Sequence, residues 1–111
     1  MEPYLLFSNK TRCIVYNMQT RAVQRMLDFD YLCGRDTPSV AGLINPGNSG
    51  THKAHWGTGE ILIPIYPNIG EALKANPDVD TMVNFASFRS AYDSTKEALE
   101  HKNIRVVGVI A

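Results

Sequence analysis

Apolar residues gather in short runs along this chain, and the runs alternate with segments in which apolar positions recur every three or four residues. Five runs predict strands, at 12–17, 39–44, 60–66, 81–85 and 104–111. Three segments predict helices, at 20–29, 69–76 and 88–101. Apolar strands that alternate with helices favour a mostly parallel sheet covered on both faces. We therefore expect an α/β fold with a mostly parallel five-stranded sheet and helices on both faces.

Three local signals refine this pattern. Pro64 lies inside the predicted strand 60–66 and favours an edge position, because proline has no N–H to give to a neighbouring strand. Asn68, followed three residues later by Glu71, resembles a capping box that starts the second helix. The string NPGNSG at 45–50 predicts a loop, since none of its residues favours regular structure.

Composition and charge exclude several classes of function. The chain has 111 residues, the length of one modest domain, and 11 basic side chains balance 11 acidic ones. This balance predicts no nucleic-acid partner and no anionic membrane surface. No apolar run approaches the length of a membrane span, and MEPYLLF is too short for a signal peptide. Cys13 and Cys33 have no C-x-x-C spacing, and we expect them to be reduced thiols of a cytoplasmic protein.

Three loops follow predicted strands, and in a doubly wound sheet all three converge on one edge, where such folds bind ligands. NMQTRAV opens a helix at Thr20 whose N–H groups favour an anion. It lacks the glycines of G-x-G-x-x-G, so by itself it favours an ordinary helix start. NPGNSG has two glycines that let a ligand approach the backbone, although such a loop is more often a plain turn.

The third loop, ASFRSA, carries the richest chemistry. It offers the hydroxyls of Ser87 and Ser90, the amides of a helix start and the Arg89 guanidinium. Phe85 and Phe88 offer a face on which an aromatic ring can stack. Serine and arginine at a helix start are common, but three such loops on one edge favour a ligand that has both phosphates and a ring.

The remaining polar residues predict no further chemistry. His52 and His55 lack a third ligand, so we expect them to face solvent rather than a metal. The aspartates at predicted element boundaries are interpreted as solvated caps, namely Asp28, Asp30, Asp78 and Asp80. No Ser/His/Asp or Cys/His spacing predicts a nucleophile, and we assign no catalytic residue.

Long strings of the sequence resemble ATP-citrate lyase (ATP-citrate synthase). They are MLDFDYLCGRDTPSVAG, EILIPIYPNI and NFASFRSAYDS, and the resemblance covers nearly the whole chain. The matching region of that family is similar to the α subunit of succinyl-CoA synthetase. The resemblance implies that residues 1–111 form one Rossmann-like CoA-binding domain, a fragment of a longer subunit.

The resemblance also implies roles for individual residues toward CoA, which is a substrate. Phe85 would pack on the adenine, Ser87 would bond a phosphate, and Arg89 would flank the adenine or the phosphates. The loop at Pro46 and Gly47 would line the other side of the nucleotide. Gly47 stands where the single-chain animal members have an aromatic residue that stacks on the adenine.

Two further loop positions belong to the predicted site. Ser90 adds a hydroxyl to the loop after the fourth predicted strand. Gln19 and Thr20 lie in the turn where related synthetases hold CoA, although this turn lacks their glycine-rich pattern.

The family's overall reaction converts citrate, ATP and CoA into acetyl-CoA, oxaloacetate, ADP and phosphate, through a phosphohistidine, citryl phosphate and citryl-CoA. The resemblance implies that ATP and Mg are bound by an ATP-grasp subunit similar to the β subunit of succinyl-CoA synthetase, and that a citryl-CoA lyase module completes the enzyme. None of these parts matches the present residues, so we expect the domain to be inactive alone. The full enzyme would be a hetero-oligomer that makes acetyl-CoA, including in the reductive TCA cycle.

Two alternatives stay open at this point. The chain is also compatible with the CoA-binding domain of a citryl-CoA or succinyl-CoA synthetase subunit, which has the same fold and ligand. The other alternative is a non-catalytic nucleotide-sensing module.

Overall fold

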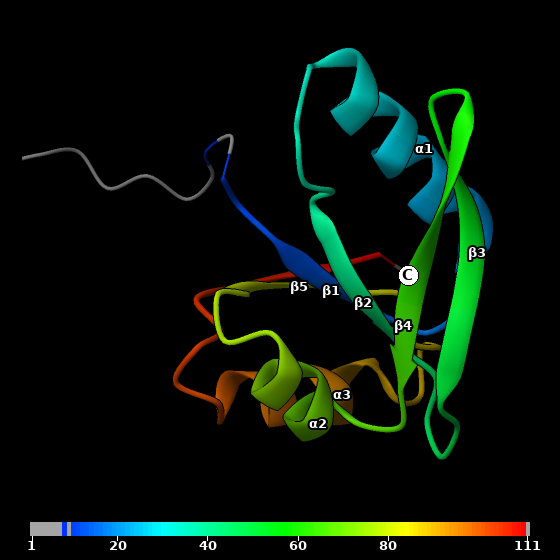
Figure 1. The fold of residues 1–111 in the computed structure, drawn as a ribbon. Helices are drawn as coiled ribbons and strands as arrows, with labels where there is room; N and C mark the ends of the chain where they lie inside the picture. The colour runs from blue at the N-terminus through cyan, green and yellow to red at the C-terminus, as the bar shows by residue number, and fades with distance from the viewer. Residues whose placement is uncertain (1–7, 9, 111) are drawn as a thin grey trace, which may run out of the picture.

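A six-stranded sheet forms the centre of the computed structural model, which describes residue 8 and residues 10–110. The strand order is β3-β4-β2-β1-β5-β6 (Figure 1). The strands are β1 (Cys13–Tyr16), β2 (Val40–Ile44), β3 (Gly50–Trp56), β4 (Gly59–Tyr66), β5 (Thr81–Asn84) and β6 (Val106–Val109). Only β3 and β4 pair antiparallel, and every other neighbouring pair is parallel. The predicted mostly parallel sheet is therefore confirmed.

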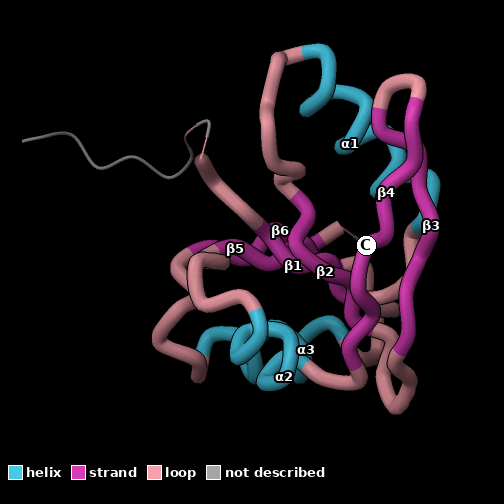
Figure 2. The backbone as a smooth tube through the Cα atoms, viewed as in Figure 1, coloured by secondary structure: helices cyan, strands magenta, loops and turns pink. Residues whose placement is uncertain are grey.

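Helices cover both faces of this sheet, as predicted (Figure 2). Helix α1 (Thr20–Leu32) lies on one face, and α2 (Ile69–Ala75) and α3 (Ala91–Leu99) lie on the other. Val23 and Leu27, one helical turn apart, bring α1 onto Val15 and Leu43 of the sheet. The opposite face is packed by a second cluster, which includes Ile14, Ile69, Leu73, Met82 and Ala98. The two separate clusters explain why the central strands are apolar along their whole length.

The prediction of five strands is wrong, because β3 adds a sixth. Its sequence, GTHKAHW, is mostly polar, and only Ala54 is buried. β3 is the outer strand of a hairpin with β4 that runs from Gly50 opposite Ile65 to Trp56 opposite Gly59. An edge strand with a solvated face has no apolar run to reveal it in the sequence.

The predicted edge position of Pro64 is also wrong, since β4 lies between β3 and β2. β2 pairs with β4 only at Ile65 and Tyr66. Pro64 therefore precedes the short parallel ladder, at a point where β4 is paired with β3 alone. Its missing N–H is tolerated because the interior position of β4 begins one residue later.

The predicted helix starts are partly confirmed. Asn68 caps α2, because its side-chain oxygen accepts a hydrogen bond of 2.8 Å from the Glu71 amide. Helix α3 begins at Ala91 rather than at 88, because the preceding residues form a separate turn in which the Ser90 amide donates to the Ser87 carbonyl.

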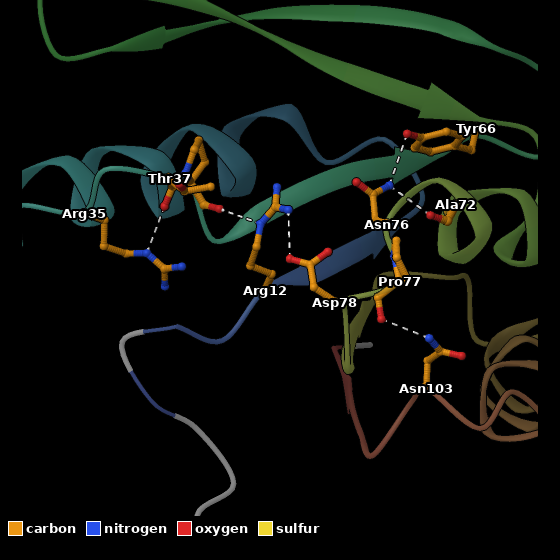
Figure 3. A network of polar contacts seen from close by, with 10 residues as sticks. Arg12, Arg35, Thr37, Tyr66, Ala72, Asn76, Pro77, Asp78 and Asn103 are labelled. Carbon is orange, nitrogen blue, oxygen red and sulfur yellow. Dashed lines mark hydrogen bonds and ion pairs between the residues drawn. The ribbon is translucent and has the colours of Figure 1, made fainter.

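Polar contacts fasten the amino end of the sheet (Figure 3). The Arg12 guanidinium, just before β1, pairs with the Asp78 carboxylate at 3.1 Å and donates to the Pro38 carbonyl at 3.3 Å. It thus joins the segments that lead into β1, β2 and β5. Nearby, the Asn76 amide donates to the Tyr66 hydroxyl at 3.1 Å.

The prediction of a solvated carboxylate is wrong for Asp30. Its side chain is buried and accepts hydrogen bonds from both the amide and the hydroxyl of Ser39, at 2.7 and 2.6 Å. These bonds satisfy a buried charge and tie the last turns of α1 to the start of β2.

Within the described residues, no helix has the length and apolar character that crossing a membrane requires.

The two thiols differ sharply in their surroundings, and this difference generates a prediction. Cys13 is buried in β1 and Cys33 is exposed after α1. Burial, with a smaller contribution from the Asp30 carboxylate, raises the pKa of the Cys13 thiol to about 12. We expect a thiol reagent at about pH 8 to modify Cys33 in the folded chain and Cys13 only after unfolding, because the thiolate is the reactive form.

The measurement is a colorimetric thiol count with and without denaturant. Cys33→Ser should abolish labelling of the folded chain, and rapid labelling of two thiols in the folded state would contradict the prediction. Because folding raises the Cys13 pKa, stability should be unaffected below the ordinary thiol value of 9.0 and should fall as the pH rises above it.

Candidate functional site

The carboxyl ends of the parallel strands lie side by side at one edge of the sheet. Tyr16, the last residue of β1, is in register with Ile44 at the end of β2 and with Asn84 at the end of β5. The three loops that follow these strands therefore meet, as predicted. We call loops 17–19, 45–49 and 85–90 the carboxyl-edge site.

Asn17 braces these loops against one another. It has a positive φ of 79°, which asparagine tolerates better than most residues. Its backbone N–H donates to the Ile44 carbonyl at 2.9 Å. Its side-chain nitrogen donates to the Phe85 carbonyl at 3.2 Å, and its side-chain oxygen accepts from the Met18 amide. One side chain thus holds the loops after β1 and β5 together.

Asn84, at the end of β5, also holds the loop at 85–90 in place, and its side chain is completely buried. Its side-chain nitrogen donates to the hydroxyls of Ser94 and Thr95 in α3, at 2.9 and 3.0 Å. Its side-chain oxygen accepts from the Ala86 amide at 2.9 Å. The loop at 85–90 is therefore fixed at both of its ends, to β5 and to α3.

All three helices begin at this edge, but their first turns differ. Only α2 has a side-chain cap, from Asn68, and neither Gln19 nor Ser90 caps its own helix. The first turns of α1 and α3 thus present backbone N–H groups that no capping side chain occupies. Such amides, together with the helix dipole, favour an anion.

The side chains of the loop at 85–90 are presented to solvent around this helix start. Ser87, Phe88, Arg89 and Ser90 are all exposed. The hydroxyl oxygens of Ser87 and Ser90 lie 2.9 Å apart, so both can contact one ligand group. Arg89 forms no ion pair or side-chain hydrogen bond with any residue that the structure describes. Its guanidinium is available to a phosphate.

Phe85 differs from its neighbours in the loop. It is half-buried and packs against the core cluster on the α1 face. Its amide donates to the Tyr16 carbonyl at 3.1 Å. The backbone at Phe85 therefore continues the alignment of β1 and β5 by one residue.

The remaining predicted residues lie at the same edge. Gln19 and Thr20 are exposed at the start of α1. Pro46 and Gly47 are exposed in the loop after β2, on the other side of β1 from the loop at 85–90. Gly47 has a φ of 78°, which favours glycine, and its amide donates to the Pro67 carbonyl. The structure brings the predicted residues to one edge, and their contacts with a ligand stay a prediction.

A cavity of about 760 Å³ does not coincide with this site. It lies near the opposite edge of the sheet, and Arg12, Asp30 and Arg35 are among the residues that line it. Arg12 is paired with Asp78 and Arg35 donates to the Thr37 carbonyl, so two of its cations already have partners. We base the site on the carboxyl edge because the exposed Arg89 guanidinium, unlike these cations, has no partner among the described residues, and the Ser87 and Ser90 hydroxyls bond only each other and the Ser87 carbonyl.

Asn17 and Asn84 are the functional residues that sequence reasoning missed. An asparagine ends or follows four of the parallel strands, as Asn17, Asn45, Asn68 and Asn84. This repetition at the ends of apolar runs was a signal, because a short amide side chain can bond both donors and acceptors of a loop.

The carboxyl-edge site is suited to binding rather than to acid–base chemistry. Burial raises the pKa of the Tyr16 phenol at the end of β1, and the Glu97 carboxylate raises it further. Tyr16 therefore stays neutral at physiological pH. Among the described residues, no three histidine, cysteine or acidic side chains gather to hold a metal ion.

Similarity to known proteins agrees with this geometry. The family model described as CoA binding domain matches residues 8–111. The chain is 55% identical over 108 residues to ATP-citrate synthase of Bos taurus, and 56% identical over 109 residues to a probable ATP-citrate synthase subunit 1 of Schizosaccharomyces pombe. These matches cover 96% and 97% of the chain but only 10% and 18% of those proteins.

A solved structure is similar as well. ATP citrate lyase from Methanothrix soehngenii in complex with citrate and coenzyme A superposes with a TM-score of 0.91 at 53% identity. The match covers 93% of this chain and 17% of that one. At this identity and TM-score the fold is shared.

The bracing role of Asn84 can be tested by Asn84→Ala. We expect this change to lower the free energy of unfolding by about 2 to 3 kcal/mol, because it leaves the buried Ala86 amide without an acceptor. Chemical denaturation measures the loss.

Asn103→Ala is the matched control, because the exposed Asn103 amide bonds the Pro77 carbonyl at the surface. It should change stability by less than about 0.5 kcal/mol. Equal losses in the two variants would refute a special role for Asn84.

Proposed function

Since the chain belongs to the CoA binding domain family, we propose that the carboxyl-edge site holds the nucleotide end of coenzyme A. The observation that carries this proposal is the exposed Arg89, which has no partner among the described residues, beside the uncapped start of α3. A guanidinium, two neighbouring hydroxyls and free helix amides are the groups that bind phosphates most strongly in proteins. The first turn of α1 adds amides from across the edge.

We propose further that the domain serves a longer enzyme of the ATP-citrate synthase type. In that enzyme CoA would react with an activated citryl group to give acetyl-CoA and oxaloacetate, and ATP with Mg would be bound outside these residues. The support is the identity above 50% to ATP-citrate synthases over nearly the whole chain. The partners would be an ATP-grasp subunit and a citryl-CoA lyase module.

The chain's own part in such a reaction is to position a substrate. Ser87, Ser90 and Arg89 would fix the phosphates, and Pro46 and Gly47 would border the nucleotide from the loop after β2. The thiol end of CoA would then point away from the anchored end toward the reacting groups. Holding one end of a long substrate lowers the entropy that the reaction step must still lose.

Titration calorimetry with CoA, dephospho-CoA and NAD tests the proposal. We expect CoA to bind more tightly than NAD, and Arg89→Ala to weaken CoA binding by about 10-fold through the loss of a charge-assisted contact. Arg89→Lys should fall between the two, because lysine keeps the charge but not the fork of donors. Raising the salt concentration should weaken the binding of CoA to the unmodified chain.

Arg25→Ala serves as the control, since Arg25 is also exposed but lies on the body of α1. It should leave CoA binding unchanged. Tighter binding of NAD than of CoA, or equal effects of the Arg25 and Arg89 changes, would overturn the proposed site.

A further inference from the structure

The outer face of α1 carries two large apolar side chains that the fold does not cover. No other described helix lies on the side of the sheet that α1 covers, so this face is open (Figure 1). Phe29 is 67% exposed and Leu32 is 83% exposed. Their spacing of three residues places them side by side on the helix. Neighbouring exposed apolar groups of this kind are typical of a contact surface.

A hollow of about 330 Å³ lies beside these side chains. Met26 and Phe29 of α1 line it, together with Ser39, which precedes β2. Leu32 follows Phe29 by three residues, and Met26 precedes Phe29 by three. The projecting leucine and the hollow therefore lie equally far from Phe29 along the helix, in opposite directions.

The charges at the two ends of α1 oppose its own dipole. Arg21 lies in the first turn, where the helix amides already carry partial positive charge, and this turn has no acidic residue. Asp36 is exposed just past the other end, where the partial charge is negative. Neither Arg21 nor Asp36 forms an ion pair with a residue that the structure describes. A partner with the reverse pattern of charge would compensate both ends.

A second copy of the same helix has that reverse pattern when it runs antiparallel to the first. A two-fold axis at Phe29 brings Leu32 of each copy opposite Met26 of the other, so that each leucine meets a hollow. The same axis brings Arg21, eight residues before Phe29, toward Asp36, seven residues after it. The two helix dipoles also oppose each other in this arrangement, which is favourable.

We propose that two copies of this chain associate through the outer face of α1, with the two helices antiparallel. Leu32 of each copy fills the hollow beside Met26 of the other. At either end of the contact, Arg21 of one copy pairs with Asp36 of the other. The contact does not use the loops of the carboxyl-edge site, so it goes beyond the proposed function and does not rest on it.

The size of the contact sets its strength. Helix α1 has 13 residues and is therefore about 20 Å long. One such helix from each copy gives an interface at the small end of the range for specific complexes. We therefore expect the dimer to dissociate at micromolar concentrations.

Sedimentation equilibrium of the chain between about 1 and 500 μM tests the inference. We expect the average mass to rise with concentration toward that of two chains. Leu32→Asp should weaken the association by at least about 10-fold, because it places a charge in an apolar hollow. Leu99→Asp is the matched control, since Leu99 is also exposed but lies on α3, at the opposite face of the sheet. It should associate as the unmodified chain does.

A charge exchange tests the antiparallel arrangement. Arg21→Asp and Asp36→Arg should each weaken self-association by about 3- to 10-fold, because each places like charges opposite one another at both ends of the contact. An equimolar mixture of these two variants should regain the affinity of the unmodified chain, since opposite charges then face each other at both ends.

Three results would overturn the inference. The first is a chain that stays monomeric at the highest concentration, which would leave the outer face of α1 to another part of a longer enzyme. The second is an equal loss of association on changing Leu32 and Leu99, which would indicate non-specific contact. The third is a mixture of the two charge variants that associates no more tightly than either variant alone.

Discussion

The buried amide of Asn84 is the contact on which the carboxyl-edge site depends. It stands at the last residue of β5, bonds two hydroxyls of α3 and accepts from the Ala86 amide. A buried amide that lost these partners would be costly, so its bonds fix where β5 stops and how α3 begins. The four exposed residues between them gain a defined position without using their own side chains for it. The side chain that holds the loop, Asn84, is buried and polar, whereas the side chains at 87–90 that can contact a ligand are exposed.

Local charge, rather than net charge, makes the carboxyl edge favourable for an anion. The chain as a whole is neutral, and Arg12 near the opposite edge is paired with Asp78. At the carboxyl edge the uncapped amides of α1 and α3 add partial positive charge to that of Arg89. An anion site can therefore exist on a chain whose composition predicts none.

The sequence revealed what burial determines. Apolar runs located the strands that are packed on both faces, and their alternation with helices predicted the parallel sheet and the shared edge. The strand β3 was not predicted, because only Ala54 of its seven residues is buried. Asp30 was wrongly predicted to be solvated, because its partner Ser39 is nine residues away. The loops of the site could be predicted, since they follow strands. The bracing bonds could not be predicted. Asn17 bonds the Phe85 carbonyl, 68 residues away, and Asn84 bonds Ser94 in a helix whose position relative to β5 the sequence pattern does not give.

The exposure of the site sets the kind of recognition that it can provide. Hydrogen bonds and ion pairs made at a surface replace equally good contacts with water, so each contributes little net free energy. Stacking on an exposed ring differs, because it removes apolar surface of both partners from water. At the proposed site, therefore, charged and hydroxyl groups would fix the position of a phosphate, and buried apolar contact would contribute most of the affinity for a base.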